Sequence, residues 1–368
     1  MKEKFCVVHI PNYIDLNGKS GSSIRPRKMV EAFESCGYHV DFVMGYGADR
    51  KEKIKKIKEN IRNGVKYDFL YSENSTTPTL LTEKNHFPRY PHLDFGFMGF
   101  CKKNGIKIGL FYRDIYWKFE VYKKEVPLFK RCISIPMYKY DLKQYNKLLD
   151  ILYLPSAKMR PYVNEVSKYK PLPPGCDIDK EIIKYKKEEQ GKDSKVLNLF
   201  YVGGVGNLYD LTELLSAVRN LDFVQLTVCC RKEEWNARQH YYRQYMGDNI
   251  TVVHKSGKDL LPYYRQADIC MLFFESSGYR GFAMPIKLFE YLSMQTPIIA
   301  TQGSAAGDFV EQNDIGWNIG YDRNELEELL NQINTNRNLL EEKRGNLETA
   351  LIKNSWKARA EQVIQDLK

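Results

Sequence analysis

Short apolar runs, each bounded by turn residues, alternate with helical patterns along almost the whole chain. Strands separated by helices in this way are typical of parallel sheets covered by helices, so the sequence predicts an α/β fold. The two halves have the same organisation, which predicts two domains of this kind. The expected strands are residues 5–10, 39–44, 69–72, 106–112 and 151–154 in the first half, and 197–202, 225–230, 250–253, 269–274, 297–300 and an edge at 317–319 in the second.

A proline-rich segment at residues 171–175 separates the two series and has the composition of a stiff linker. The chain has 368 residues, which is long for one core and sufficient for two. We therefore assign residues 1–172 to a first domain and 173–353 to a second. The last helix, at 354–368, is expected to cross back and pack on the first domain.

The positive charge of the chain is concentrated in its first half. Residues 1–172 contain 32 Lys and Arg against 18 Asp and Glu, whereas the rest contains 24 against 28. Such a surface attracts a polyanion, and the candidates are an anionic membrane, a lipid-linked diphosphate or nucleic acid. Residues 116–147 interleave aromatic side chains with lysines, as interfacial segments do, although a solvated helix pair over a core has the same pattern. The chain has no nucleic-acid-binding signature, so we expect no nucleic-acid partner.

The cysteines and the start of the chain indicate a cytoplasmic protein. The eight cysteines lie mostly in apolar strands and form no CxxC pair or metal-ligand spacing, so we interpret them as buried residues in a reducing compartment and expect no metal site. The first residues, MKEKFCVVHIPNY, and the remaining apolar runs are too short for a signal peptide or a membrane span. Binding of the basic half to lipid would place the protein at the inner face of the cell membrane.

The most specific local pattern is AMPIKLFEYLSMQTPIIAT at residues 283–301, which joins a short helix to a buried strand. Pro285 suits the first helical position, and the later Thr-Pro pair would stop the helix. Lys287 and Glu290 lie three residues apart near the helix start. The helix N-terminus and Lys287 could hold a diphosphate, and Glu290 could accept hydrogen bonds from a ribose diol. The alternative is an ordinary amphipathic helix with a solvated Lys–Glu pair.

The strand-to-helix turns of the second half are candidate ligand loops, because ligands of open α/β sheets bind beyond the carboxyl ends of strands. Gly203 and Gly204 would let the backbone approach a phosphate, but the sequence lacks the third glycine of GxGxxG, which disfavours a dinucleotide fold. Arg231 at a strand end could neutralise a diphosphate or be a surface side chain. Glu275 begins a loop of hydroxyls and glycines that could line a sugar, or it is simply solvated.

Two turns of the first half are candidate acceptor loops. Gly18, Ser20 and Gly21 belong to a glycine- and serine-rich loop that could hold an anion or shape itself round an acceptor, and that could equally be a plain turn. Arg113 and Asp114 follow a predicted strand. Asp114 could act as a general base or contact the acceptor, or it could cap the next helix.

These motifs resemble those of the GT-B glycosyltransferases, most of all the retaining, nucleotide-sugar-dependent family 4 and related capsule and adhesin glycosyltransferases. The resemblance covers nearly the whole chain, and its most specific part is PIKLFEYLSMQTPIIAT at 285–301. Family 4 members usually carry two glutamates eight residues apart in this region. Glu290 matches the second, but Phe282 stands in place of the first, which leaves the sugar-facing role to Glu275 or to the backbone of residues 278–283. The other matching segments are the glycine loop after the first strand, PPGCD at 173–177, YVGG at 201–204, the turn at 256–257 and YYRQADICMLF at 263–273.

The resemblance implies two Rossmann-like domains facing across a cleft, with the acceptor on the first and the nucleotide sugar on the second. It also implies a reaction without a metal or another cofactor. The implied catalytic residues are Asp114, Arg231 and Lys287. The implied donor-binding residues are Gly203, Gly204, Arg231, Ser256, Gly257, Glu275, Gly281, Phe282, Lys287, Leu288 and Glu290. The implied acceptor-binding residues are Gly18, Ser20, Gly21, Arg113 and Asp114.

The expected function is transfer of a sugar from a UDP- or GDP-sugar to a glycan or lipid-linked acceptor in the synthesis of a cell-surface polysaccharide or glycoconjugate. Two alternatives stay open. A nucleotide-sugar 2-epimerase has the same architecture, but its acidic and histidine clusters are missing here and the six histidines are scattered. A non-catalytic partner that binds a nucleotide sugar or a glycan is the other alternative.

Overall fold

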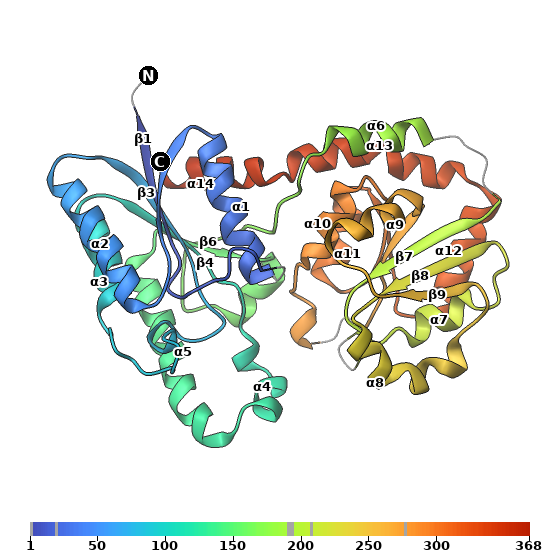
Figure 1. The fold of residues 1–368 in the computed structure, drawn as a ribbon, viewed down its shortest axis with the longest axis horizontal. Coiled ribbons are helices and arrows are strands. Elements are labelled where there is room, and N and C mark those ends of the chain that lie inside the picture. The colour runs from blue at the N-terminus through green and yellow to red at the C-terminus, as the bar shows by residue number, and fades with distance from the viewer. Residues whose placement is uncertain (1–2, 19–20, 190–194, 207–208, 276–277) are drawn as a thin grey trace. The chain divides into compact units, whose positions relative to one another are not determined.

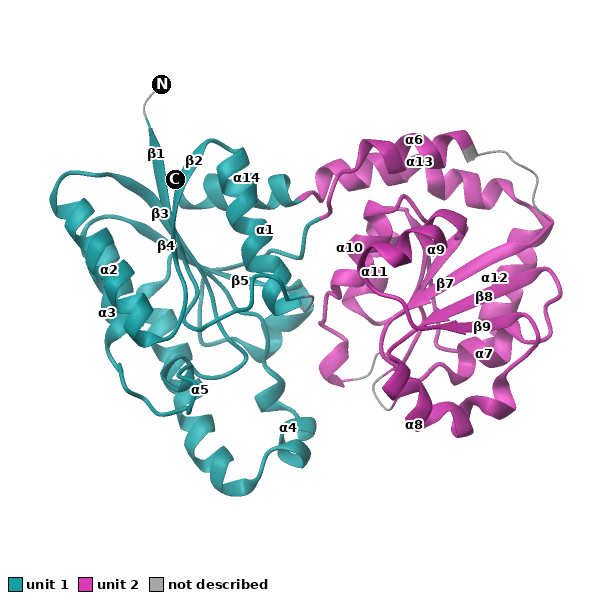
Figure 2. Cartoon of the chain, viewed as in Figure 1, with its two compact units in different colours: residues 1–175, 356–368 teal, residues 176–355 magenta. Residues whose placement is uncertain are grey.

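The computed structural model describes residues 3–18, 21–189, 195–206, 209–275 and 278–368. The chain forms two compact units, Met1–Gly175 with Trp356–Lys368, and Cys176–Ser355 (Figure 2). The expected domain limits fall within a few residues of these boundaries. Each unit is built on a parallel sheet with helices on its faces (Figure 1), so the predicted α/β fold is confirmed.

The sheet of the first unit has the strand order β2-β1-β3-β4-β5-β6, with every neighbouring pair parallel. The inner strands are almost entirely buried, as their continuous apolar sequences predict. The strands are β1 Lys4–His9, β2 Tyr38–Val43, β3 Tyr67–Glu73, β4 Lys107–Phe111, β5 Ile151–Leu154 and β6 Tyr169–Pro171. The helices of this unit are α1 Gly21–Ser35, α2 Gly47–Arg62, α3 Leu93–Lys103, α4 Glu120–Glu125, α5 Leu128–Leu148 and α14 Trp356–Leu367.

The C-terminal helix α14 packs against α1 and the core of the first unit, as the sequence predicts (Figure 1). Val363 and Leu367 of α14 are buried there. Gly175 must be glycine for the chain to pass Trp356, because a Cβ atom at Gly175 would lie 2.6 Å from the backbone nitrogen of Trp356.

The sheet of the second unit has the order β12-β11-β10-β7-β8-β9 and is also parallel. Two core clusters cover its faces. The strands are β7 Leu197–Val202, β8 Val224–Cys229, β9 Ile250–Val253, β10 Ile269–Leu272, β11 Ile298–Thr301 and β12 Gly316–Ile319. The helices are α6 Lys180–Glu189, α7 Thr212–Val218, α8 Lys232–Tyr242, α9 Leu261–Gln266, α10 Ile286–Ser293, α11 Ala305–Gln312, α12 Arg323–Thr335 and α13 Asn338–Lys353.

Three local expectations need correction. Pro171, expected in a linker, ends the edge strand β6, where a missing N–H costs little. Pro285 has an extended ψ of 138° and precedes the first helical residue instead of occupying it. Helix α10 ends before the Thr-Pro pair, because Gln295 turns the chain with a φ of 52°. Among the helices of the described residues, none is both long and apolar enough to cross a membrane.

Candidate active site at the carboxyl edge of the second sheet

The carboxyl ends of β7, β8 and β9 lie side by side in the second unit. Val202, the last residue of β7, pairs with Cys229 of β8, which pairs with Val253 of β9. The loops that carry the predicted donor-binding residues Gly203, Arg231 and Ser256 therefore leave the sheet at one edge. This is the edge at which open α/β sheets bind their ligands.

The glycine loop after β7 folds back over a tyrosine. The Tyr201 hydroxyl donates a hydrogen bond to the carbonyl of Gly204 at 2.6 Å. A Cβ atom at Gly203 would lie 2.5 Å from the Tyr201 hydroxyl oxygen, and one at Gly204 would lie 3.1 Å from the ring of Tyr209. Only glycine fits this close approach at Gly203. The backbone of residues 203–204 therefore faces the edge of the sheet with no side chain to cover it.

Helix α10 is joined to the end of β7 through Tyr291, whose hydroxyl accepts a hydrogen bond from the backbone N–H of Val202 at 3.0 Å. In the first turns of α10, the Lys287 ammonium lies 2.5 Å from a carboxylate oxygen of Glu290. The same oxygen accepts a hydrogen bond from the hydroxyl of Tyr264 at 3.2 Å. Lys287 and Glu290 are 31% and 34% exposed, so both can reach a ligand. The sequence left open whether Lys287 and Glu290 bind a ligand or form an ion pair with each other. In this structure they form the ion pair, at the edge of the sheet where a donor would bind.

Leu288 and Phe282 lie in the interior of the second unit. Leu288 is fully buried in the core beneath α10, and Phe282 is 4% exposed. Any contact of these two residues with a donor would therefore use their backbone atoms. The backbone of Gly281 is held in place, because its carbonyl accepts a hydrogen bond from the N–H of Ala305 at 2.8 Å.

Arg231 lies at the start of α8 with its side chain 80% exposed. Its guanidinium pairs with one carboxylate oxygen of Glu234 at 2.5 Å, and the other oxygen of Glu234 accepts from the N–H of Val205 at 3.3 Å. Glu234 thus connects Arg231 to the glycine loop. An exposed pair of this kind contributes little to stability, so Arg231 is available for a ligand.

Arg280 was not singled out by the sequence. Its guanidinium carbon lies 3.7 Å above the centre of the Tyr209 ring and 5.2 Å from that of Phe274. Burial lowers the pKa of the Arg280 guanidinium, and the phenols of Tyr209 and Tyr201 partly oppose this shift. Its Nη1 atom is buried without a hydrogen-bond partner. The sequence shows only that Arg280 lies inside the predicted sugar loop. The fold places its guanidinium over Tyr209, the tyrosine that follows the glycine loop.

The remaining predicted donor-loop residues are Glu275, Ser256 and Gly257. Glu275 is exposed just after β10, and residues 276–277 lie outside the described residues. Ser256 precedes a 3₁₀ turn, and Gly257 has a φ of 60°, a left-handed conformation that favours glycine.

In the first unit, Arg113 and Asp114 follow β4 at the carboxyl edge of the sheet. Asp114 accepts a hydrogen bond from the N–H of Tyr116 at 2.9 Å, but the N-cap position of the short 3₁₀ turn that follows is Ile115, so Asp114 stabilises this turn from one residue earlier than the capping role considered from the sequence. The Arg113 guanidinium lies 2.8 Å from Glu73, a fully buried carboxylate at the end of β3 that also pairs with Arg25 at 3.3 Å. Burial lowers the pKa of Arg113, and the Glu73 charge opposes this shift. Arg113 is therefore held in a network centred on Glu73, which the sequence did not single out.

The predicted anion loop of the first unit is only partly described. Gly18 closes a turn, with its N–H donating to the carbonyl of Asp15 at 3.0 Å, and Gly21 begins α1. Ser20 lies outside the described residues. The Arg25 guanidinium is buried and stacks 3.6 Å from the ring centre of Phe111, so it is not a free anion-binding group of this loop.

One histidine, His9, belongs to a buried polar network of the first unit. His9 at the end of β1 lies 2.9 Å from Asp94 and 2.9 Å from Ser72 through its two ring nitrogens. Arg50 contacts both oxygens of Asp94 at 2.9 Å. All four side chains are buried, so the network braces the first unit and is closed to a substrate.

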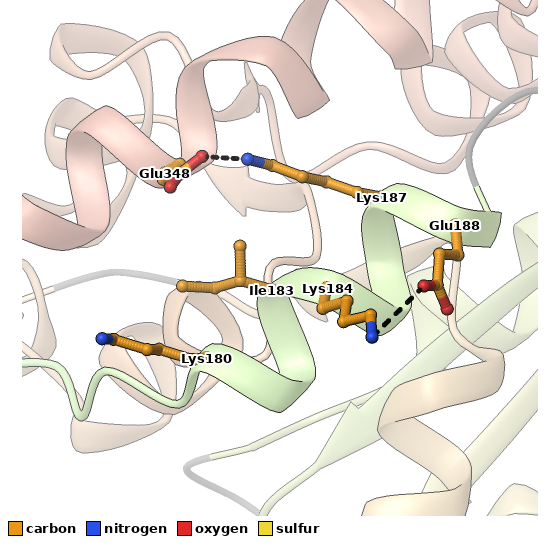
Figure 3. Close-up of a pocket in the computed structure, with 6 residues that line it drawn as sticks. All are labelled: Lys180, Ile183, Lys184, Lys187, Glu188 and Glu348. Atoms are coloured by element: carbon orange, nitrogen blue, oxygen red, sulfur yellow. Dashed lines mark ion pairs between the residues drawn. The ribbon is translucent and has the colours of Figure 1, made fainter.

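A shallow surface hollow of about 470 Å³ lies between α6 and α13 of the second unit (Figure 3). Two of its three lysines are in ion pairs, with Lys187 2.6 Å from Glu348 and Lys184 4.0 Å from Glu188. None of the predicted site residues lines it. Within the described ranges, no group of three or more His, Cys, Asp or Glu side chains is arranged to hold a metal ion.

Comparison with known proteins agrees with this geometry. Residues 197–336 match the family model described as "Glycosyl transferases group 1". The matched range contains the glycine loop, Arg231, Arg280, Lys287 and Glu290. No curated protein sequence matches the chain.

Solved structures with a similar fold span nearly the whole chain. Sucrose-phosphate synthase from Thermosynechococcus elongatus is 15% identical with a TM-score of 0.62, covering 99% of this chain and 98% of that one. A glycosyltransferase from Rickettsia africae is 13% identical with a TM-score of 0.60, covering 100% and 98%. HepE from Anabaena, solved with UDP-glucose, is 10% identical with a TM-score of 0.59, covering 98% and 99%. At these identities the likeness shows the fold alone.

The two units of the chain have the GT-B fold of these solved structures, and the family match in the second unit supports a transferase enzyme. Its second unit carries the glycosyl transferases group 1 domain. The narrower assignment to family 4 stays a prediction.

Proposed function

We propose that the chain transfers a sugar from a UDP- or GDP-sugar to a glycan or lipid-linked acceptor, in the synthesis of a cell-surface polysaccharide or glycoconjugate. The observation that carries this proposal is the Lys287–Glu290 pair in the first turns of α10. The pair is partly exposed, at the edge where the glycine loop leaves the sheet. The match of this region to a glycosyltransferase family supports it. The UDP-glucose in the structure of HepE supports a nucleotide-sugar donor.

On donor binding, Lys287 would exchange its contact with Glu290 for the diphosphate, and the freed Glu290 carboxylate would accept hydrogen bonds from the ribose. The unpartnered Nη1 of Arg280, together with exposed Arg231, would add positive charge where the leaving diphosphate becomes more negative. The backbone at residues 203–204 and 256–257 would contact the phosphates and the base. The sugar would lie against Glu275 and the loop at 278–283.

In the reaction, the bond between C1 of the sugar and the diphosphate oxygen breaks, and C1 forms a new bond to an acceptor oxygen. The acceptor proton would pass to the leaving diphosphate on the same face, which retains the configuration at C1 and requires neither a metal nor another cofactor. Asp114 and Arg113, at the carboxyl edge of the first sheet, would contact the acceptor. The excess of basic residues in the first half supports a cytoplasmic enzyme that works at an anionic membrane surface.

Thermal unfolding with a panel of nucleotides and nucleotide sugars tests this proposal. A ligand at a hundred times its dissociation constant adds about 2.7 kcal/mol of stability, which moves the unfolding midpoint by degrees. We expect one diphosphate to raise the midpoint and one nucleotide sugar to raise it further, with release of that nucleotide when an acceptor is added. A folded protein that responds to none of them would contradict the proposal and favour the non-catalytic alternative.

Lys287→Ala should weaken binding of the effective nucleotide by about ten-fold or more, because it removes a charge-assisted contact with the phosphates. Lys184→Ala is the matched control, since Lys184 also pairs with a glutamate on a helix of the same unit but lies in the hollow of Figure 3. Isothermal titration measures both. Equal affinities of the two variants would remove Lys287 from the site.

Arg280→Lys separates charge from stacking at the second proposed phosphate contact. Lysine keeps the charge but not the planar group that stacks on Tyr209, so we expect a loss of affinity intermediate between wild type and Arg280→Ala. Wild-type affinity in Arg280→Ala would show that Arg280 only packs against the tyrosine.

A further inference from the structure

Helix α5 has an inward and an outward face, and both are rich in apolar groups. The inward face, which includes Ser134, Tyr138, Leu142 and Tyr145, is buried against the first unit. The outward face carries Phe129, Ile133, Pro136 and Tyr140, whose spacing of four, three and four residues follows the period of an α-helix. A helix on the surface of a water-soluble protein is normally polar on its outward face, so this apolar stripe needs an explanation.

The stripe is well exposed. Phe129 is 66% exposed and Ile133 is 54% exposed, and Leu128 beside them is 67% exposed. Cys132 is exposed on the same side of the helix. The turn between α4 and α5 projects from the first unit (Figure 1), and Leu128 and Phe129 are the first two residues of α5 after that turn.

The position of the stripe is set by firm packing on the inward face. Tyr138 stacks on Trp117 with ring centres 5.0 Å apart and donates a hydrogen bond to the carbonyl of Thr76 at 2.6 Å. The hydroxyls of Tyr122 and Ser134 are hydrogen-bonded, which ties α4 to α5. At the other end of the stripe, the Tyr140 ring packs edge-on against Phe95 with ring centres 5.7 Å apart, so the freely exposed part of the stripe is its first half, at Phe129 and Ile133.

The exposed charges of α5 itself are all positive. Exposed lysines flank the stripe at Lys130, Lys139, Lys143 and Lys147, whereas Asp141, the one acidic residue in the sequence of α5, is buried. The neighbouring helix α4 carries exposed charges of both signs, two lysines and two glutamates, and adds no net charge. An apolar stripe bordered by lysines is the arrangement of helices that lie in the interface of an anionic bilayer. Protein interfaces, by contrast, are depleted in lysine.

We propose that the outward face of α5 docks the enzyme on an anionic lipid bilayer, with Leu128, Phe129 and Ile133 entering the headgroup region and the flanking lysines meeting lipid phosphates. This inference rests on the membrane-surface part of the proposed function, since it names the surface that would bring a lipid-linked acceptor to the first unit. It does not depend on sugar transfer. Its test therefore measures lipid binding alone.

Co-sedimentation with vesicles tests the proposal. We expect the full-length protein to bind vesicles of equimolar phosphatidylcholine and phosphatidylglycerol, and to bind pure phosphatidylcholine vesicles weakly. The double variant Phe129→Ser/Ile133→Ser should lower the partition into anionic vesicles by about ten-fold or more. Phe87→Ser is the matched control, because Phe87 is also 66% exposed in the first unit but lies outside α5, and it should bind as wild type does.

A charge variant separates the two contributions. Lys130→Glu/Lys139→Glu should lower binding to anionic vesicles and make the remaining binding less sensitive to salt, whereas Lys55→Glu/Lys56→Glu on α2 changes the same charge elsewhere and should have a smaller effect. Equal effects of the two charge variants would show general attraction to the basic unit and would overturn docking through α5.

Two further results would overturn the proposal. One is equal binding of wild type to neutral and anionic vesicles, or to neither. The other is a concentration-dependent dimer in size-exclusion chromatography that the Phe129→Ser/Ile133→Ser variant abolishes, which would make a second copy the occupant of the stripe. Nucleotide-induced stabilisation should be the same in this variant as in wild type, so failure of the docking proposal is distinguishable from failure of the proposed function.

Discussion

Two buried aspartates of the first unit have pKa values shifted in opposite directions. Burial alone raises the pKa of Asp94, but hydrogen bonds and charges from His9 and Arg50 outweigh it and hold the pKa below its usual range. Asp141 is also buried, and its hydrogen bonds to Thr79 do not offset burial, so its pKa is raised to about 7. The Arg50 guanidinium lies beside Asp94, whereas no cation is among the described contacts of Asp141, and this explains the difference.

The raised pKa of Asp141 makes the stability of the first unit pH-dependent. Between about pH 4 and pH 7 the folded state holds the Asp141 proton more tightly than the unfolded chain, so this group lowers stability as the pH rises through that window. Asp141→Asn removes the titration and can still accept a hydrogen bond from the Thr79 N–H. We expect the unfolding midpoint of the Asp141→Asn variant, relative to that of wild type, to rise from pH 5 to pH 8 in thermal melts. A constant difference would contradict this assignment.

Asp94→Asn should destabilise the first unit by about 3–5 kcal/mol, because it leaves the buried Arg50 guanidinium without its carboxylate partner. Glu59→Gln is the control, since Glu59 forms an exposed pair with Lys55 and should change stability by less than about 0.5 kcal/mol. Urea unfolding followed by circular dichroism measures both. A similar small change in the two variants would show that the network at Asp94 adds nothing to stability.

At the scale of elements, every strand except β6 follows from the sequence. The apolar runs of the inner strands are buried on both faces, so local composition suffices to find them. The short strand β6 was missed, because its residues Tyr169–Pro171 are exposed and include a proline, so only pairing with β5 makes it a strand. Which face of α5 is buried could likewise not be predicted. Apolar residues on both sides of the helix leave no simple amphipathic pattern in the sequence.

Helix α14 belongs to the first unit although it follows the second in the chain. We therefore expect Val363→Ala to destabilise the first unit by about 2 kcal/mol, through lost burial and the cavity left in the core. Lys357→Ala, an exposed position on the same helix, is the control for helix propensity and should be close to neutral. Hydrogen exchange in β1 and β3 measures the loss. Faster exchange in the second unit instead would contradict the role of α14.

At the scale of the whole molecule, each unit has its own hydrophobic core. Unfolding of such a chain is not expected to follow a single two-state transition, and a ligand that binds one unit stabilises that unit first. With the effective nucleotide, hydrogen exchange should slow at the carboxyl ends of β7, β8 and β10 and in α10. Exchange in β1, β3 and β4 should be unchanged by nucleotide alone. Protection centred on the first unit would contradict the assignment of the donor to the second sheet.

Much of the candidate site could be predicted from sequence because it lies in strand-to-helix turns. Arg231, Lys287 and Glu290 were found by their positions after strands or at a helix start, and the structure places them on one unit at one edge. Arg280 and Glu73 could not be found in this way. Their roles depend on contacts with Tyr209 and with Arg25 and Arg113, which lie far away in the sequence.

The sequence by itself determined the fold class and the division into two α/β units, because periodicity and turn residues act over a few neighbouring positions. Only the tertiary structure decided which buried charges neutralise one another, which glycine must pass close to another chain segment, and which face of α5 stays apolar and exposed. These features depend on distances between residues that the chain brings together from remote positions. Burial and electrostatic energy follow those distances, and no local pattern encodes them.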